Sequence, residues 1–564
     1  MFLPAYCAPA ATSRGAEKNF MLLVHRSAAG LLTLSALLPI MAAAQAPTAD
    51  HDTAPELPVV TVHGTQAVDA ARAEAAQVPG AVSVVDAEQW RESASRTLKD
   101  MLDFTAGVFA QPKWGEDTRL SIRGSGLSRN FHLRGVQLYQ DGVPLNAADG
   151  SADFQEIDPT AFRHTEVYKG ANGLRFGANA LGGALNFVTR TAADDEPLQL
   201  RTDAGRFDLY RVQLSGGQRI GDFDAYATGS WLKFGGYREH SDGESLRGAA
   251  NLGWAISSAM SSRFYVSGGD IEQRIPGSLT KRAALAAPRT AASNNLHLDY
   301  QRNMRTWRIA NRTEYRAEAY TVEYGGAVAD KQLIHPIFQY LDYEYRDYSA
   351  FARIVFASTL AGYDNRLTLG ANLQYGEIDN TQFRNLPNAE RGELLSAAKD
   401  RAENTTVYVE DALRLTPAWT LIAATQVVEA ERRRRDALPD AMDTSGAQDY
   451  RFTSPRLGVL WQARPALQVF ANVSRSGEAP SFGELNFSNA ALADTRAQRA
   501  TTAELGTRGE HGALAWDLAV YRAQLRNEFQ FFDLGGGSYQ VENADRTIHQ
   551  GIEAALRATL AEQL

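Results

Sequence analysis

Apolar and polar residues alternate with a period of two along much of the second part of the chain. In the stretch LYRVQLSGG, Tyr210, Val212 and Leu214 share one parity, and Arg211 and Gln213 share the other. The same alternation recurs in residues 249–256 and 514–525. This pattern is typical of strands whose two faces meet different surroundings. It predicts a series of long β-strands from residue 197 to residue 564.

The connections between these strands are predicted to differ in length. Tight turns are expected within residues 414–421 and 461–470, and long polar loops over 271–296 and 322–345. The arginine-rich run 431–436 is expected in an outer loop, in contact with lipopolysaccharide or solvent. Short turns on one side and long loops on the other are typical of outer-membrane β-barrels. A secreted β-sandwich or propeller remains an alternative, because the signal of each strand is weak.

Residues 57–190 have a different pattern, with short strands punctuated by glycines. Asp141 and Gly142 form a strong hairpin-turn signal. The glycines do not fit a phosphate loop, since GSGLSR lacks the third glycine of a dinucleotide fingerprint and no P-loop motif occurs. A compact mixed α/β domain is therefore predicted.

The first residues resemble an export signal. Residues 1–44 contain the apolar run Ala28–Ile40 after a basic residue, then Ala42–Ala44 as a cleavage site, with Met21 as a possible true start. Residues 45–56 form a Pro-, Ala- and acid-containing linker without a core pattern. We expect the protein to leave the cytoplasm.

Composition narrows the function classes. The hydrophobic fraction is 44% and the mean hydropathy is −0.32, so helical membrane spans are not expected. The net charge of −9 argues against a nucleic-acid partner. The single cysteine, Cys7, lies in the predicted signal, which leaves no thiol for catalysis, metal binding or disulfides. Zincin, nucleophile-elbow and EF-hand motifs are absent, so an enzyme is not predicted.

Several ordered motifs together resemble TonB-dependent outer-membrane receptors of the ferric-siderophore or ferric-citrate type. They are LPVVTVHG (57–64), SIRGSG (121–126), LYQDGVPLN (138–146), TEVYKGANGLRFGANALGGALNFVT (165–189), FANVSRSGEAPSFGELN (470–486), TTAELGTRG (501–509) and NADRTIHQGIEAAL (543–556). The resemblance implies a mainly β fold, a transmembrane antiparallel β-barrel with an N-terminal α/β plug domain in its lumen. It assigns 57–64 to the TonB box, 65–190 to the plug and 197–564 to the barrel.

The barrel segment is short for this family. Plugged transporters have about 22 strands, whereas residues 197–564 have room for roughly 14–16. The last residues, GIEAALRATLAEQL, stop in mid-pattern. We expect a barrel that is incomplete at its C-terminal end.

The resemblance also implies a plug–barrel latch. Arg123 and Lys169 of the plug would face Glu504 and Glu553 of the barrel. Lys169 stands where the family more often has arginine, and lysine lacks the planar fork that binds a carboxylate through two hydrogen bonds. Taken one at a time, each of these charges could equally be a solvated surface residue.

The TonB box would add as a strand to a sheet edge of the TonB C-terminal domain, a contact made mainly by backbone groups. Its residues are Leu57, Pro58, Val59, Val60, Thr61 and Val62. The alternative is an ordinary first strand of the plug. Only a short linker precedes the box, so an additional signalling domain is not expected.

Ligand contacts are predicted at the plug apex. Cationic and aromatic side chains there suit an anionic ferric chelate, although each could be an ordinary loop residue. The candidates are Lys113, Trp114, Arg129, Phe131, His132, Asn146 and Asp149.

The sequence therefore predicts a receptor in the outer membrane of a Gram-negative bacterium that imports a ferric siderophore or similar chelate. The expected partners are TonB, the chelate, and outer-membrane lipid and lipopolysaccharide, without nucleic acid. No cofactor is expected, since iron is carried only within the ligand. A carboxylate-type chelate such as ferric citrate is weakly favoured. The alternatives are a passive porin or adhesin barrel and a secreted β-rich enzyme.

Overall fold

The alternating residues of the second part of the chain form one sheet of 16 strands, which we call the wall sheet. In the computed structural model, the described residues are 64–129, 133–177, 181–194, 198–438, 443–485, 495–535 and 538–558, all within one compact unit, Thr61–Leu564. The predicted signal, linker and TonB box residues Leu57–Val62 lie outside them. No helix among the described residues is long and apolar enough to cross a membrane.

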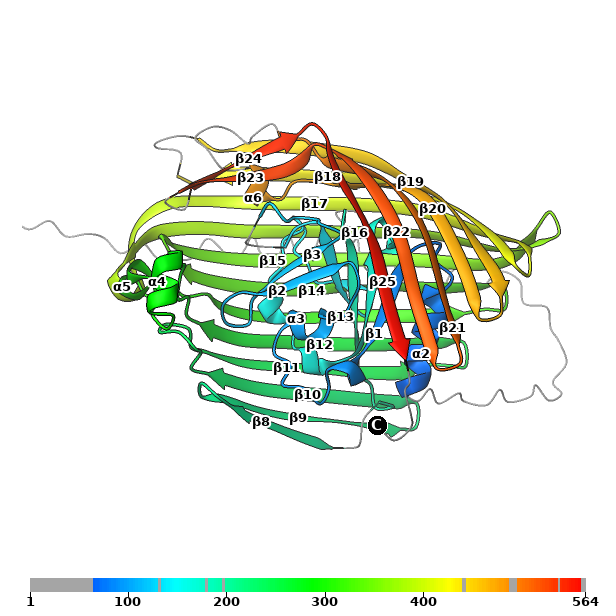
Figure 1. Ribbon diagram of the computed structural model, residues 1–564, viewed down its shortest axis with the longest axis horizontal. Coiled ribbons are helices and arrows are strands. Elements are labelled where there is room, and N and C mark those ends of the chain that lie inside the picture. Colours follow the sequence, from blue (N-terminus) through cyan, green and yellow to red (C-terminus); the bar gives the residue numbers. More distant parts are fainter. Residues whose placement is uncertain are drawn as a thin grey trace, which may run out of the picture. The chain divides into compact units, whose positions relative to one another are not determined.

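The wall sheet is an antiparallel meander in which each strand pairs with its neighbours in sequence, except that β25 pairs with β22. Strands β8 and β25 are the outermost in the order (Figure 1). The strands are β8 (Gln199–Gly205), β9 (Leu209–Ile220), β10 (Phe223–Phe234), β11 (Gly243–Ala255), β12 (Met260–Gln273), β13 (Asn303–Arg316), β14 (Tyr320–Pro336), β15 (Gln339–Leu360), β16 (Tyr363–Leu386), β17 (Glu390–Thr416), β18 (Trp419–Asp436), β19 (Gly446–Arg464), β20 (Leu467–Glu478), β21 (Gln498–His511), β22 (Leu514–Arg526) and β25 (Thr547–Ala558).

The connections of the wall sheet contain few further elements. A separate hairpin, β23 (Glu528–Gly535) and β24 (Ser538–Ala544), lies between β22 and β25 in the chain. The short helices are α4 (Lys281–Ala286), α5 (Ser293–His297), α6 (Phe482–Leu485) and the 3₁₀ turn η6 (Pro387–Ala389). All of them follow the same ends of the wall strands, which we call the long-loop end. The opposite, short-turn end carries turns such as residues 417–418 and 465–466.

The plug domain precedes the wall sheet and contains a five-stranded mixed sheet of order β1-β6-β7-β4-β5, in which β4 and β7 are parallel. The elements are α2 (Gly64–Ala75), β1 (Val82–Asp86), η1 (Ala87–Gln89), α3 (Leu98–Leu102), β2 (Val108–Pro112), β3 (Thr118–Ile122), β4 (Val136–Gln140), β5 (Val143–Pro144), η2 (Phe154–Glu156), η3 (Pro159–Ala161), β6 (Phe162–Lys169), η4 (Gly170–Asn172), η5 (Leu174–Phe176) and β7 (Gly183–Thr189). Its apolar core includes the fully buried Leu98, Ile122, Leu185 and Phe187. The predicted fold class, a mainly β barrel-type sheet with an N-terminal α/β plug, is confirmed.

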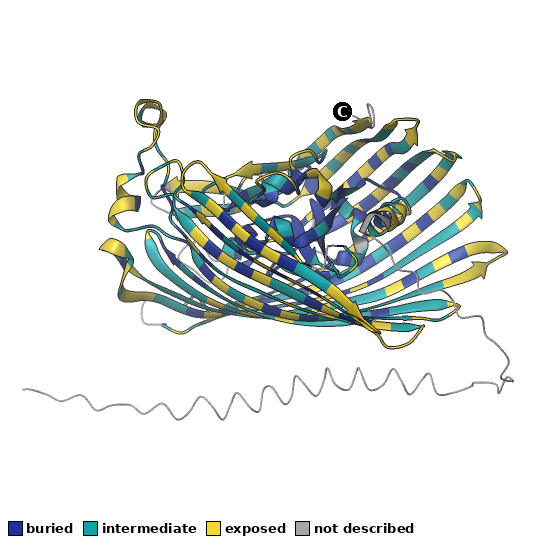
Figure 2. Ribbon diagram, turned by 90° about the horizontal axis from the view of Figure 1, so that it is seen from below, coloured by how far each residue is buried: buried dark blue, intermediate teal, exposed yellow. Residues whose placement is uncertain are grey.

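The two faces of the wall sheet have opposite chemistry. On β9, Val212 and Leu214 are exposed, while Arg211 and Gln213 are buried against the plug domain. Figure 2 shows the resulting stripes of buried and exposed residues along the strands. Because strands at both ends of the sheet contact the plug, the polar face curves around it. The apolar face is the one available to lipid.

Aromatic pairs mark the edge of the apolar face at the short-turn end. The rings of Phe223 and Trp254 are stacked at 5.6 Å, and those of Trp419 and Trp461 at 5.3 Å. Aromatic girdles of this kind lie at the membrane–water interface of outer-membrane barrels. The apolar band therefore begins near the short turns.

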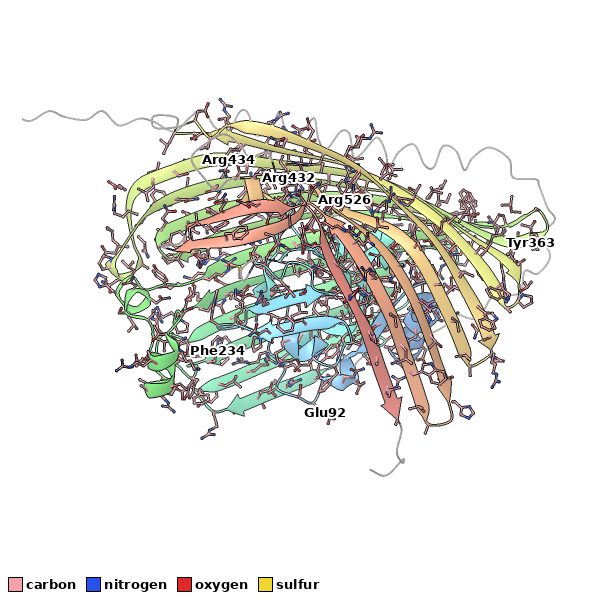
Figure 3. All side chains as sticks on the ribbon, turned by 45° about the horizontal axis from the view of Figure 1, so that its top comes forward. Glu92, Phe234, Tyr363, Arg432, Arg434 and Arg526 are labelled. Carbon is pink, nitrogen blue, oxygen red and sulfur yellow. The ribbon has the colours of Figure 1, made fainter. Side chains whose placement is uncertain are left out.

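Two predicted loops are instead strands. Residues 322–345 belong to β14 and β15, which continue past the apolar band and meet at residues 337–338. Residues 431–436 are the end of β18, with Arg432 and Arg434 buried on the inner face (Figure 3). Clusters of polar residues suggested loops, but cross-strand pairing continues beyond the lipid because water can solvate both faces there.

The loss of stability caused by an arginine introduced on the apolar face should depend on its position between the two membrane interfaces. Leu457 is 68% exposed on the outer face of β19, between Trp461 and the polar end of the strand. We expect Leu457→Arg to lower the free energy of unfolding by about 2–4 kcal/mol, and Thr453→Arg, nearer the interface, by about 0–1 kcal/mol. Urea titrations of the full chain in lipid vesicles measure both values. Equal costs at the two positions would contradict the assignment of the lipid-facing band.

Candidate functional site

Arg123 lies at the centre of a buried charge cluster between plug and wall. Its Nε donates to Glu553 Oε1 at 2.8 Å, and its Nη2 donates to Glu553 Oε2 at 2.9 Å and to Glu504 Oε1 at 2.6 Å. The guanidinium carbon lies 4.3 Å from the centre of the Tyr521 ring. The three charged side chains are at most 6% exposed. The structure thus brings together three of the four residues predicted to form a latch in direct hydrogen bonds.

Lys169 joins this cluster through a longer contact. Its Nζ lies 3.6 Å from Glu553 Oε2, and the side chain is 2% exposed. Arginine's planar fork donates two parallel hydrogen bonds to one carboxylate, whereas an ammonium acts as a point charge. The contact of Lys169 with Glu553 is therefore mainly electrostatic.

Glu504 connects more of the plug than its charge alone would suggest. Besides Arg123, Glu504 accepts hydrogen bonds from the backbone N–H of Ala81 at 3.0 Å and from Asn172 Nδ2 at 2.9 Å. A wall residue, Asn472, donates to the same carboxylate at 3.0 Å. A buried carboxylate with this many donors is well compensated.

The sequence interpretation did not include the two asparagines around Glu504. The parity of β20 could have indicated Asn472, because it shares the inner face with Ser474 and Ser476. Asn172 belongs to the turn η4, and no periodic signal marked it.

The backbone conformation of Arg123 directs its side chain toward the wall. Arg123 has φ +54°, a left-handed value that few residues other than glycine adopt, and its N–H donates to Gly107 O at 2.9 Å. Burial by itself would lower the pKa of the guanidinium, but the hydrogen bonds and charges of Glu553 and Glu504 raise it above its usual value. The side chain therefore stays charged.

A second buried cluster, the apex cluster, lies toward the long-loop end and consists of Arg129, Arg134, Glu478 and Glu484. Arg129 Nη1 lies 2.5 Å from Glu484 Oε1, and Arg134 lies 2.8 Å from Glu478 Oε1 and 3.2 Å from Glu484 Oε1. Ser481 supplies two further hydrogen bonds to Glu484. These contacts hold the segment after β20 against the plug.

The other predicted ligand residues are distributed over the plug. Lys113 Nζ lies 2.6 Å from Asp117 Oδ2 and 5.5 Å from the Trp114 ring centre. Asn146 is buried; its Oδ1 accepts from the N–H of Leu138 and its Nδ2 donates to Gly150 O, while Asp149 accepts from the N–H of Ser151. Phe131 and His132 lie outside the described residues.

The charged side chain of Arg129, another predicted ligand residue, is engaged in contacts within the protein. Its guanidinium faces Glu484 and lies 4.7 Å from the Phe531 ring centre. In this structure, Arg129, Asn146 and Asp149 therefore make structural contacts.

The arginines at the end of β18 extend the polar lining of the lumen. Arg434 pairs with Asp400 through Nε and Nη2, both at 2.5 Å. Arg432 donates to Pro480 O at 3.0 Å and to Asn404 Oδ1 at 3.0 Å. Arg432 thereby fastens the segment between β20 and α6 to the wall.

A cavity lies between the plug and the inner faces of β10–β15. Its lining combines the carboxylates of Asp153, Glu156 and Asp347 with the cationic groups of Arg308 and Lys331. Lys331 contacts Asp153 at 3.0 Å and Glu156 at 3.1 Å. The lumen therefore contains open space beside the plug as well as close polar contacts.

Helix α2, the first described element, is anchored at its C-terminal end. Glu74 pairs with Arg175, which also lies 3.1 Å from Glu166. Arg508, close to the short turn at residues 512–513, donates to the carbonyls of Ala76 and Val78 just after the helix. Helix α2 therefore lies at the short-turn end.

The described residues contain no group of three or more His, Cys, Asp and Glu side chains placed to hold a metal ion.

Comparison with known proteins gives the following similarities. Residues 100–561 match the family model described as TonB dependent receptor-like, beta-barrel. The metal-pseudopaline receptor CntO of Pseudomonas aeruginosa is 22% identical over 86% of this chain and 72% of its own length. The vitamin B12 transporter BtuB of Vibrio vulnificus is 24% identical over 85% of this chain and 72% of its own length.

Solved structures have the same fold. The ferric citrate transporter FecA, in its unliganded form, superposes with a TM-score of 0.73 at 16% identity, covering 87% of this chain and 76% of FecA. The ferric yersiniabactin receptor FyuA of Yersinia pestis gives a TM-score of 0.69 at 16% identity, covering 86% and 77%.

The anchor of α2 should depend on pH. Burial would raise the pKa of Glu166, but the neighbouring His164, the charge of Arg175 and a hydrogen bond from Asn186 lower it from 4.5 to about 2. A carboxyl whose pKa is lowered by folding stabilises the fold at pH values above its unfolded pKa. This contribution to the free energy of unfolding is lost as the pH falls from 4.5 to about 2. We expect Glu166→Gln to reduce the acid-induced decrease in the free energy of unfolding by roughly 3 kcal/mol at most.

Urea midpoints of the full chain between about pH 5 and about pH 2 measure the effect. Glu88→Gln is the matched control, since Glu88 is an exposed plug carboxylate that pairs with the partly exposed Arg91. If Glu166→Gln kept the acid slope of the natural chain, the assigned role of Glu166 would be wrong.

Proposed function

Because the chain belongs to the TonB-dependent receptor β-barrel family, whose members are non-enzymatic transporters of the Gram-negative outer membrane, we propose that it imports a ferric siderophore or similar iron chelate. The observation that carries this proposal is the plug, held inside the polar face of the wall by the buried cluster of Arg123, Glu504 and Glu553. A plug of this kind closes a passive pore, so passage of a ligand needs energy to move it.

Similarity supports the ligand class. FecA and FyuA are by name transporters or receptors of ferric chelates, and CntO is named for metal-pseudopaline. BtuB is named for vitamin B12, which is also a metal chelate. Iron chelates are the class that the sequence analysis favoured, and vitamin B12 is the ligand against which the proposal has to be tested.

Energy would enter at residues Leu57–Val62, the proposed TonB box. An extended segment can pair with a sheet edge of the TonB C-terminal domain, and backbone hydrogen bonds then carry a pulling force. Helix α2 follows this segment directly and is held by Glu74 with Arg175 and by Arg508. A force on the box would therefore first act on these anchors at the short-turn end, which we assign to the periplasm.

The latch residues would set the next step. Removing one partner of a buried ion pair costs about 3–5 kcal/mol, because the other charge stays buried without compensation. A pull that moves the plug has to separate Arg123 and Lys169 from Glu504 and Glu553, or hydrate them in place. The longer contact of Lys169 would be exchanged before the hydrogen bonds of Arg123.

Ligand binding would take place at the apex on the long-loop side, which faces outward. Lys113, Trp114, Phe131 and His132 remain proposed contacts there. Arg129, Asn146 and Asp149 are proposed only together with a rearrangement, because all three are buried in contacts within the protein, whereas Lys113 is partly exposed.

Disrupting the proposed TonB box should abolish energised uptake and spare binding. In a strain whose only copy of the gene carries Val60→Pro, the box loses a backbone N–H donor needed for strand addition. We expect uptake of at least one ⁵⁵Fe probe, supplied as ferric citrate, a ferric trihydroxamate or a ferric tricatecholate, to fall to the level of the gene deletion. Binding of that probe to cells at 4 °C should be unchanged.

Radiolabelled vitamin B12 is the comparison ligand, and Asp52→Pro in the preceding linker is the control for the substitution itself. Uptake of vitamin B12 without uptake of any iron probe would overturn the proposed ligand class. Normal uptake of iron by Val60→Pro cells would overturn the position of the box.

Removing the cations of the latch should change transport more than binding. We expect the double variant Arg123→Ala with Lys169→Ala to destabilise the docked plug by about 3–5 kcal/mol and to alter the rate of energised uptake. Probe binding at 4 °C and rates of uptake with and without an active TonB system measure the two effects. Arg433→Ala with Lys399→Ala, on the exposed outer face, is the charge-matched control.

A loss of probe binding with unchanged uptake kinetics per bound ligand would contradict the latch.

A further inference from the structure

His549 of β25 connects three parts of the molecule. Its Nδ1 lies 3.1 Å from the backbone carbonyl oxygen of Arg123, and its Nε2 lies 3.1 Å from Glu528 Oε1 at the start of β23. One ring therefore joins the plug, the wall and the β23–β24 hairpin. Figure 1 shows this hairpin at the long-loop end of β22 and β25.

The partners of His549 determine its protonation. A backbone carbonyl and a carboxylate both accept hydrogen bonds and cannot donate. Both ring nitrogens must therefore carry a proton for both bonds to form, and only the imidazolium has two N–H groups. A neutral ring would lose one of the two bonds.

The carbonyl that His549 contacts belongs to a strained residue. Arg123 has φ +54°, and such left-handed residues persist only when their surroundings hold them. Its N–H is fixed by Gly107 O at 2.9 Å and its C=O by His549, so the peptide groups on both sides of Cα are held. This conformation directs the guanidinium toward Glu504 and Glu553.

The hairpin contacts the same plug segment a second time. Ser128 Oγ donates to Phe529 O at 2.9 Å, and the guanidinium of Arg129 lies 4.7 Å from the Phe531 ring centre. Through Glu528 the hairpin is also tied to His549. Movement of the hairpin thus acts on both ends of the segment 123–129.

Room for movement exists beside the ring. A small cavity is lined by Arg123, Gly170, Tyr521, Glu528 and His549, and Arg123 Nη1 has no hydrogen-bond partner among the described residues. The charged or titratable groups that surround His549 are Glu528 on β23, Tyr521 on β22, and Arg123 with its partners Glu504 and Glu553. Water entering this cavity could replace the bond that a neutral ring gives up.

We propose that His549 is a positioning residue for the latch: as an imidazolium it holds Arg123 in the left-handed conformation and fastens the β23–β24 hairpin to it through Glu528. Loss of its proton releases one bond and couples opening of the hairpin to loosening of Arg123. The docked state is therefore held more tightly at about pH 5.5, where the ring carries both protons, than at about pH 8, where it has lost one. The inference rests on the proposed latch for its role in transport, but its structural content requires no ligand.

Hydrogen–deuterium exchange of the full chain in outer-membrane vesicles tests the proposal directly. Exchange of the amides in residues 121–129 is measured at about pH 5.5 and about pH 8 and corrected for intrinsic rates. In the natural chain we expect about fivefold greater protection at the lower pH, the effect of about one hydrogen bond. His549→Gln and Glu528→Gln should each remove this pH dependence.

His511→Gln, at an exposed position of β21, is the matched control and should behave like the natural chain. A pH dependence that persists in both Glu528→Gln and His549→Gln would overturn the proposal. It would also be overturned if each variant, compared with the natural chain, lost the same amount of protection at both pH values. Glu528→Gln keeps the size and an acceptor oxygen of the side chain, so it reports on charge even if His549→Gln fails to fold. Because exchange is measured without ligand or TonB, failure of the transport proposal would appear separately, in the uptake measurements.

Discussion

Charge neutralisation across the boundary between plug and wall is the constraint on which the rest of this structure depends. The plug contributes Arg123, Arg129 and Arg134, and the wall and its loops contribute the carboxylates that face them. Burying either set alone would cost several kcal/mol per charge. Each part therefore requires the other in one orientation, and this requirement places the plug more specifically than apolar packing could.

The boundary between plug and wall is polar along much of the wall sheet. The contacts run around the wall from Arg211 on β9, through Arg247 on β11, to Glu553 on β25. When a hydrogen bond to a charged group is exchanged for water, the net cost is about 1.5–3 kcal/mol, whereas an apolar boundary would lose its full hydrophobic contribution. The apolar core of the plug lies within the plug itself, so the domain can be displaced from the wall without exposing that core.

The contacts with β20 to β25 are organised along one short plug segment. Arg123 at its start meets the wall strands β21 and β25, while Arg129 and Arg134 meet the segment after β20 and the aromatic rings of β23. Events at the long-loop end and at the latch are thus separated by only a few residues of plug backbone. At the other end of the molecule, α2 is held by separate ion pairs.

Local pattern was sufficient to predict much of this protein. Period-two alternation determines which side chains of a strand share a face, because successive side chains of a strand point to opposite sides. For this reason the lipid-facing and plug-facing residues of β9 could be read directly from LYRVQLSGG. The motifs around Arg123, Lys169, Glu504 and Glu553 indicated the family and its charged residues. The loop prediction for residues 431–436 was wrong because composition was given more weight than parity, which places Arg432 and Arg434 on the inner face.

No local pattern decided which charges meet: the partners of Arg123 were expected only from the family resemblance, and the tertiary structure shows the contacts. Arg123 and Glu553 are 430 residues apart in the chain, and no local rule relates their positions. The same holds for Asn172 and Asn472 at Glu504, for Glu484 at Arg129, and for the two acceptors that surround His549. Sequence periodicity specifies the face on which a side chain lies, but its partner across the lumen depends on strand register and on how the plug sits within the wall. Those are properties of the whole fold, set by many contacts at once.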